Sequence, residues 1–101
     1  MNPLVSVVLP TYNREKHIEK AMQSVFLQTY ENMEFVIVND GSTDGTEHII
    51  SNLAKKNPKI VIVTNTVNMG IVGALNRGIS IARGQYIARL DDDDTWIDER
   101  K

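Results

Sequence analysis

Four short apolar runs, separated by three longer amphipathic segments, constrain the fold more than any other feature of this sequence. The runs predict buried strands, and they lie at Leu4–Leu9, Phe35–Val38, Ile60–Val63 and Gln85–Leu90. Strands that alternate with helices pair in parallel through right-handed crossovers. The sequence therefore predicts one α/β domain, a Rossmann-like three-layer α/β/α arrangement with a mostly parallel sheet in the order 3-2-1-4.

The first two segments between the runs have the periodicity of amphipathic helices. Asn13 is the expected N-cap of the first, whose apolar face consists of Ile18, Ala21, Met22, Val25 and Phe26. The second is expected to begin at a capping box formed by Asp44 and Glu47 and to end before Pro58.

A third helix is expected after Asn68-Met69-Gly70, with its end near Gly84. Residues 96–101 look like the opening turn of a further helix that the chain does not finish. We see neither an internal repeat nor a linker, so the 101 residues predict a single unit.

Charge and composition exclude several classes of function. The chain has 13 acidic and 11 basic residues, a net charge of −2, and no basic face typical of nucleic-acid binding. It has no cysteine, so neither a disulfide nor a thiolate metal site can form. No apolar run approaches the roughly 18 residues of a spanning helix, and no signal peptide is evident. A cytoplasmic location is expected, with the full-length protein peripheral to a membrane as an open alternative.

Four consecutive carboxylates, Asp91 to Asp94, follow the last apolar run directly. They should lie at the carboxyl end of a strand, the edge at which open α/β sheets bind ligands. A hard cation such as Mg²⁺ or Mn²⁺ would relieve their mutual repulsion. A solvated acidic loop is the alternative.

Other polar residues should converge on the same edge: Thr11 and Tyr12 after the first strand, and Asp40 after the second. Tyr12 could stack on a base or pack in the core, and Asp40 could accept a hydrogen bond from a ligand or form a turn. Together with the carboxylates they favour a nucleoside diphosphate site. The sequence contains neither a P-loop nor a G-x-G-x-x-G fingerprint, and His17 and His48 are expected on the surface.

Four ordered motifs give this chain a resemblance to family 2 of the inverting glycosyltransferases, which adopt the GT-A fold. The motifs are Ser6-Val7-Val8-Leu9-Pro10-Thr11-Tyr12-Asn13, Val38-Asn39-Asp40-Gly41-Ser42-Thr43-Asp44, Asn68-x-Gly70 and Gly84-x-Tyr86-Ile87-Ala88-x-Leu90-Asp91-x-Asp93-Asp94. They lie in register over essentially the whole chain, which makes the resemblance specific.

The resemblance implies a role for each matching position. Pro10, Thr11 and Tyr12 would border the base and ribose, typically of a UDP-sugar, and Asp40 would bind the base. In the D-x-D element Asp93 would be the metal ligand and Asp91 would lie by the ribose or sugar and near the metal. Asp92 would also lie near the nucleotide, with Asp94 as a neighbour of the element. Structural roles fall to Gly41, Ser42 and Gly70.

The sequence departs from the family at two points. Many relatives have an Arg where this chain has Leu75, so a phosphate-facing cation from that helix is in doubt; Arg77 could replace it or be solvated. Family members also continue for a hundred residues or more beyond Lys101. That part holds the acceptor site and the general base, so no catalytic residue is expected here.

The implied activity is transfer of a sugar from a nucleotide donor to an acceptor hydroxyl, saccharide or lipid-linked, with inversion, in polysaccharide or glycoconjugate synthesis. This chain would hold the donor half and be inactive alone. The alternatives are a nucleotidyltransferase, a phosphoacceptor signalling domain, or a fragment with a purely structural role. An exposed edge at the fourth strand also predicts self-association or marginal stability.

Overall fold

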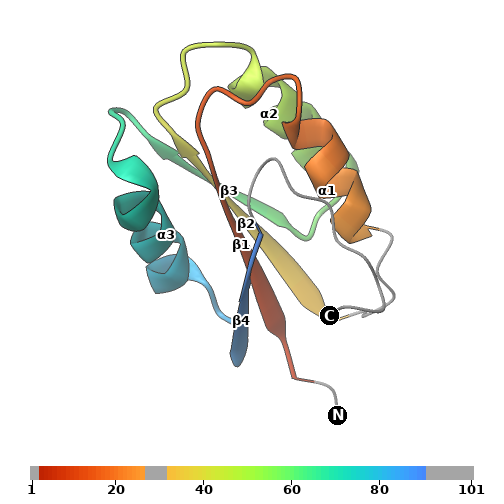
Figure 1. Cartoon of the computed structure of the whole chain (residues 1–101). Coiled ribbons are helices and arrows are strands. Elements are labelled where there is room, and N and C mark those ends of the chain that lie inside the picture. Colours follow the sequence, from red (N-terminus) through yellow and green to blue (C-terminus); the bar gives the residue numbers. More distant parts are fainter. Residues whose placement is uncertain (1–2, 27–31, 91–101) are drawn as a thin grey trace.

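The computed structural model describes residues 3–26 and 32–90. In chain order the elements are β1 (Val5–Thr11), α1 (Ile18–Phe26), β2 (Met33–Asp40), α2 (Thr46–Lys56), β3 (Ile60–Asn65), α3 (Gly70–Ile81) and β4 (Tyr86–Arg89). The strands form one parallel sheet in the order β3-β2-β1-β4 (Figure 1). The predicted fold class and strand order are confirmed. The expected helical turn at residues 96–101 lies outside the described residues.

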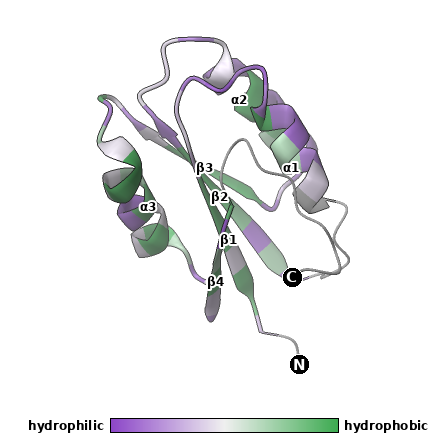
Figure 2. Cartoon of the chain, in the orientation of Figure 1, coloured by the Kyte–Doolittle hydropathy of each residue, from purple (hydrophilic) through white to green (hydrophobic). Residues whose placement is uncertain are grey.

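Helices cover both faces of the sheet, with α1 and α2 on one side and α3 on the other (Figure 1). Because side chains alternate along a strand, odd-numbered positions of β1 and β2 such as Leu9 and Ile37 join the core under α1 and α2. Even-numbered positions such as Val8 and Val36 join the core under α3. The strands are accordingly apolar along most of their length (Figure 2), as expected of a sheet that is buried on both faces.

Helix α3 lies unusually close to the sheet, because its inner face consists of small residues. Ala74 and Gly78 are its buried positions. A Cβ atom added at Gly78 would lie 2.5 Å from Cγ1 of Val8 and 2.9 Å from Cγ2 of Val38. This close packing fixes the position of the loop that precedes α3 over the ends of β1 and β2.

Strand β1 continues through Pro10, where the sequence predicts that it stops. The N–H of Leu90 donates to the carbonyl of Val8 at 3.1 Å, so even-numbered residues of β1 direct their backbone groups toward β4. Pro10 has no N–H, but its nitrogen therefore faces away from β2, beyond the end of β4 at Arg89. The ladder to β2 is intact there, and Pro10 is in register with Val38.

The expected starts of the first two helices are wrong in detail. Asn13 does not cap α1; the first α-helical hydrogen bond there runs from the N–H of Ile18 to the carbonyl of Arg14, at 2.9 Å. Asn13 has a φ of 52°, the left-handed conformation that asparagine tolerates. The N-cap of α2 is Gly45, which has no side chain that could cap the helix. The capping box of Asp44 and Glu47 is therefore absent.

The amino-terminal edge of the sheet holds a buried carboxylate, Glu34, of which 4% is exposed. It accepts hydrogen bonds from the Ser6 hydroxyl (2.6 Å), the Arg83 N–H (2.6 Å) and the Arg83 guanidinium (3.2 Å). The Ser6 hydroxyl in turn accepts the N–H of Gly84 at 2.8 Å. Burial acts to raise the pKa of Glu34, but these hydrogen bonds outweigh it and lower that pKa below its ordinary value. We call these four residues the Glu34 cluster.

The direction of the crossovers reverses between β1 and β4. Helix α1, which follows β1, and helix α3, which precedes β4, cover opposite faces of the sheet. Such a reversal opens a crevice at the carboxyl ends of the two neighbouring strands. Within residues 3–26 and 32–90, the helices are too short or too polar to cross a bilayer.

Candidate functional site

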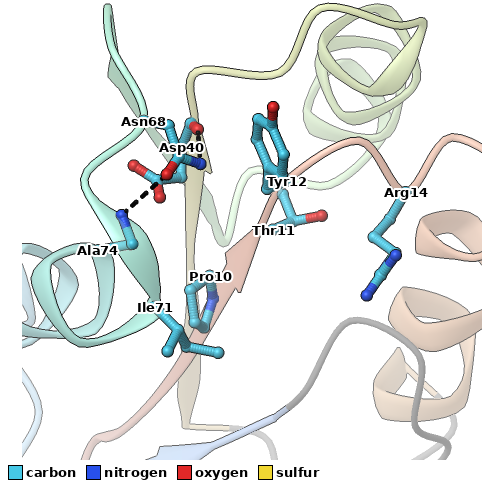
Figure 3. A pocket seen from close by; sticks show the side chains of 9 residues that line it. Pro10, Thr11, Tyr12, Arg14, Asp40, Asn68, Ile71 and Ala74 are labelled. Atoms are coloured by element: carbon cyan, nitrogen blue, oxygen red, sulfur yellow. Dashed lines mark hydrogen bonds between the residues drawn. The ribbon is translucent and has the colours of Figure 1, made fainter.

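A cavity of about 330 Å³ lies at the predicted crevice, between the end of β1 and the start of α3 (Figure 3). Its wall is formed by Pro10, Thr11, Tyr12, Arg14, Asp40, Asn68, Gly70, Ile71 and Ala74. The three residues expected at this edge, Thr11, Tyr12 and Asp40, are therefore together, and Pro10, to which the family resemblance gives a role, lies with them. Its volume lies at the lower end of the range that is typical of small-molecule sites.

Asp40, the last residue of β2, is held by groups distant in sequence. Only 3% of it is exposed, and its Oδ1 accepts the side-chain amide of Asn65 and the N–H of Met69, both at 2.8 Å. The local turn role that the sequence left open for Asp40 belongs instead to Asn39, whose Oδ1 accepts the N–H of Ser42 at 3.2 Å. Asp40 is thus positioned by long-range contacts at the cavity wall.

Thr11 contributes a buried hydroxyl group to the cavity wall. The residue is 2% exposed, and its Oγ1 makes no hydrogen bond within the part of the chain that the structure describes. Buried hydroxyls without partners are rare because their desolvation is costly. A ligand in the cavity would supply the missing hydrogen bond.

Tyr12 lies beside Thr11 at the rim of the cavity (Figure 3). Its side chain is 44% exposed, so the alternative that Tyr12 packs in the core is wrong. An aromatic ring in this position offers a face on which a planar group can stack. Pro10, Ile71 and Ala74 supply the apolar part of the wall.

The loops that follow β1 and β2 are joined by hydrogen bonds around Asn13. The N–H of Asn13 donates to the Ser42 hydroxyl at 3.0 Å, and its Oδ1 accepts the N–H of Thr43 at 2.7 Å. The structural role expected for Ser42 is thereby supported. Gly41 has a φ of 75°, and an added Cβ would lie 2.8 Å from the backbone nitrogen of Asn68. Only glycine fits at this crossing of two loops.

A second set of bonds replaces the capping box. Asp44 Oδ1 accepts the N–H and the hydroxyl of Thr46, at 2.9 and 2.6 Å, and its Oδ2 accepts the N–H of Glu15 at 3.3 Å. Glu15, rather than Glu47, gives the reciprocal bond, accepting the N–H of Gly45 at 2.6 Å. Desolvation opposes ionisation of Asp44, but these bonds outweigh it and lower its pKa below the ordinary value.

The acidic run, including the predicted Asp91, Asp92 and Asp93, lies outside the described residues. Leu90 is buried and is still bonded to β1, so the run directly follows the strand that borders the crevice. Within the described residues, no three His, Cys, Asp or Glu side chains form a group that could hold a metal ion. Carboxylate oxygens are the ligands that hard divalent cations prefer, so the donor set of the run fits such an ion.

A family model settles the class of protein. The model for Glycosyl transferase family 2 matches residues 6–101. The chain belongs to this family. The assignment favours glycosyl transfer over the nucleotidyltransferase and signalling alternatives.

Individual relatives in the family agree. The Escherichia coli enzyme named UDP-Glc:alpha-D-GlcNAc-diphosphoundecaprenol beta-1,3-glucosyltransferase WfaP is 40% identical, over 93% of this chain and 37% of its own length. Mannosyltransferase PcManGT from Pyrobaculum calidifontis, solved with GDP-Man and Mn²⁺, is 32% identical with a TM-score of 0.88 and covers 95% of this chain and 29% of its own. S. aureus TarS 1–349 with UDP-GlcNAc is 29% identical, TM-score 0.85, over 91% and 27% of the two chains.

The chain spans about a third of the length of most of the curated glycosyltransferases that it matches. The solved structures give the same proportion, so the likeness covers one part of a larger GT-A enzyme.

The sequence did not predict several residues of the cavity wall. Arg14, Asn68, Ile71 and Ala74 line the cavity; Arg14 lies in the loop after the first strand and Asn68 belongs to the Asn68-x-Gly70 motif, but neither was expected in the wall. Arg77 is exposed, in agreement with the alternative that it is solvated, and it also donates from Nη1 to Oδ1 of Asn65 at 2.7 Å. His17 and His48 are exposed as predicted, and Gly70 has a φ of 81°, consistent with its expected backbone role.

Proposed function

We propose that this chain is the donor-binding part of a family 2 glycosyltransferase that transfers a sugar from a nucleoside diphosphate sugar to an acceptor hydroxyl. The observation that carries the proposal is a pair of groups in one cavity: the buried Thr11 hydroxyl, which has no hydrogen-bond partner among the described residues, and the Asp40 carboxylate. Both groups can form hydrogen bonds with a polar ligand. Both lie at the crevice where the direction of the crossovers reverses, the place at which open α/β sheets bind ligands.

The cavity suits a nucleoside. The apolar surfaces of Pro10 and Ile71 can contact the face of a base, with Tyr12 as the stacking partner at the rim. Asp40 accepts a hydrogen bond from the edge of the base, and the Thr11 hydroxyl bonds the base or ribose. These are the roles that the family resemblance implies for the same residues.

We propose a UDP-sugar as the donor. The name of WfaP specifies UDP-Glc, and TarS was solved with UDP-GlcNAc, whereas the archaeal mannosyltransferase was solved with GDP-Man. Uracil also presents an N–H group to Asp40.

A divalent cation, Mg²⁺ or Mn²⁺, fits the acidic run that follows β4. Asp93 would hold it, with Asp91 beside the ribose or sugar as a second ligand and Asp92 near the nucleotide. Such an ion, when bound, neutralises the charge of the diphosphate leaving group. The Mn²⁺ in the P. calidifontis structure supports this choice.

The reaction follows from these roles. The acceptor oxygen attacks the anomeric carbon, the bond from that carbon to the diphosphate breaks, and the configuration inverts. A general base takes the acceptor proton, and we place that base beyond Lys101. The chain orients the donor and supplies no catalytic base, so alone it should bind a nucleotide weakly and transfer nothing.

The complete enzyme would act in polysaccharide or glycoconjugate synthesis on a saccharide or lipid-linked acceptor. The name of WfaP specifies a diphosphoundecaprenol acceptor. An acceptor of that kind would place the enzyme in the cytoplasm at the membrane surface.

Calorimetric titration tests the donor site. UDP, GDP and CDP are each titrated with and without Mn²⁺ into the chain, Asp93→Ala and Asp40→Asn, with Glu19→Ala, a change at an exposed position of α1, as control. We expect Mn²⁺-dependent UDP binding that both site variants weaken about tenfold or more and the control does not. Absence of binding to every nucleotide would contradict a preformed donor site in this chain.

Incubation with UDP-sugars and a broad acceptor panel tests the claim that the chain is inactive alone. Robust transfer would show that a catalytic base lies within the 101 residues. The experiment therefore tests where the catalytic base lies and does not test donor binding.

A further inference from the structure

Three side chains form a hydrogen-bonded series that ends at the cavity. Nη1 of Arg77 donates to Oδ1 of Asn65 at 2.7 Å, and Nδ2 of Asn65 donates to Oδ1 of Asp40 at 2.8 Å. The three residues come from α3, the end of β3 and the end of β2. We call this series the Arg77–Asn65–Asp40 relay. Asn65, its centre, is 2% exposed.

The two ends of the relay fix the orientation of the amide between them. A guanidinium group can only donate hydrogen bonds, whereas an ionised carboxylate can only accept them. Only one of the two orientations of the Asn65 amide satisfies both neighbours, the one with Oδ1 toward Arg77 and Nδ2 toward Asp40. Arg77 therefore determines which amide atom faces Asp40, although it does not touch Asp40.

The relay also determines which oxygen of Asp40 remains for a ligand. Oδ1 receives two N–H groups, from Asn65 and from the backbone of Met69. Among residues 3–26 and 32–90, no hydrogen bond engages Oδ2. Asp40 lines the cavity and Asn65 and Arg77 do not, so these two residues can act on a ligand only through Asp40.

We propose that Asn65 and Arg77 are positioning residues that hold Asp40 as a one-oxygen hydrogen-bond acceptor and so restrict the base of the donor. The inference rests on the proposed function, because it assigns the base specificity of the same site. Uracil N3 and guanine N1 carry a hydrogen that can be donated to Oδ2. Cytosine N3 and adenine N1 are acceptors, and each would face the carboxylate with a lone pair. A site that relies on one buried hydrogen bond rejects such analogues strongly.

Binding selectivity separates positioning from general support of the fold. UDP, CDP, GDP and ADP are titrated in the presence of Mg²⁺ into the chain and into Asn65→Leu, Arg77→Met and Arg77→Lys. Lys55→Met, at an exposed position of α2, is the charge-matched control, because it also removes one cation that could attract a diphosphate. The ratio of UDP to CDP affinity is the readout, since a change in overall charge affects both nucleotides alike.

We expect the ratio to exceed about tenfold in the unmodified chain and in the control. Asn65→Leu should bring it close to one, Arg77→Met should lower it several-fold, and Arg77→Lys should restore most of it. A ratio unchanged in Asn65→Leu and Arg77→Met would overturn the proposal even if both variants bound UDP more weakly. Thermal melting shows whether each variant is folded. If Asn65→Leu unfolds the chain, Arg77→Met still tests the proposal, because Arg77 is on the surface.

A nucleotide-independent measurement keeps the relay distinct from the proposed function. Hydrogen exchange of the Asn65 side-chain amide, its NMR signal identified by its loss in Asn65→Leu, should be slow in the chain and faster in Arg77→Met. Equal exchange would overturn the fixed orientation of the amide. If the unmodified chain bound none of the four nucleotides, the proposed function and the base selectivity would both be wrong, and the exchange data would still decide the orientation.

Discussion

Gly41 allows the loop after β2 and the loop before α3 to pass close to each other at the site. Its positive φ and its close approach to the backbone of Asn68 are separate demands. Gly70 shares only the first: its φ is 81°, and nothing lies within 4 Å of an added Cβ. Comparing the two positions therefore separates the cost of the positive φ from the cost of the close contact with Asn68.

Alanine at these two glycines should destabilise the chain to different degrees. Gly70→Ala should cost about 1 kcal/mol, the penalty of a left-handed conformation. Gly41→Ala should cost at least about 1 kcal/mol more, because the loop before α3 must also move. Urea denaturation measures both. If both variants lost the same free energy of unfolding, the loop before α3 would be able to move away from residue 41 without a cost in stability.

The residue scale also shows where sequence reasoning was sufficient. Thr11, Tyr12 and Asp40 follow apolar runs directly, and in parallel strands every such position reaches the same edge. Asn65 had no comparable signal, and for Asn68 and Arg77 the sequence did not indicate the hydrogen-bond partner. Their partners lie 12 to 28 positions away along the chain, and nothing in their neighbouring residues indicates which partner each will meet.

At the scale of elements, the Glu34 cluster joins β1 and β2 to the connection between α3 and β4. The Glu34 pKa is lower in the folded chain than the 4.5 expected when it is unfolded. Its stabilising effect is therefore complete above about pH 4.5 and is lost as pH falls through the folded pKa. Acid should loosen this connection.

Glu34→Gln should lower the free energy of unfolding by about 2 kcal/mol near neutral pH, because a buried charge-assisted network is lost. The difference from the unmodified chain should shrink below pH 4.5. Denaturation curves across the acid range measure it, with the exposed Glu19→Gln as control. A difference that stayed constant with pH would mean that the charge of Glu34 does not contribute.

The interiors of the elements were predictable, whereas their ends were not. Apolar runs located every strand, yet β2 extends two residues beyond its predicted run at each end, through polar Glu34 and Asp40, because long-range hydrogen bonds satisfy those side chains. Turn formers likewise predicted caps at Asn13 and Asp44. Asn13 Oδ1 instead accepts the N–H of Thr43, and Asp44 Oδ2 accepts the N–H of Glu15, so both side chains join the two loops; local rules cannot foresee these contacts.

For the whole molecule, exposed apolar side chains gather on α3 and β4. Val72 and Tyr86 are 68% and 62% exposed, and Ile71 and Ile87 are 55% and 43% exposed. Among the described strands β4 pairs only with β1, so one of its edges is open. Apolar surface beside an open strand edge favours association.

The 101-residue chain should therefore self-associate, and Val72→Glu combined with Tyr86→Lys should reduce this. Sedimentation velocity over a range of concentrations measures the effect, and Lys55→Met is a control that leaves this surface unchanged. A stable monomer of the unmodified chain at high concentration would contradict the prediction.

The pairing of β1 with β4 also has a consequence for the order of folding. Val5 is in register with Met33 but also with Tyr86, 81 positions later. Contacts between distant segments form slowly, because a long loop must close first. As the chain leaves the ribosome, the wall contributed by β1, β2 and α3 can assemble while β4 is still being synthesised. The acidic run follows β4 in the sequence, so it would leave the ribosome only after the residues that form this wall.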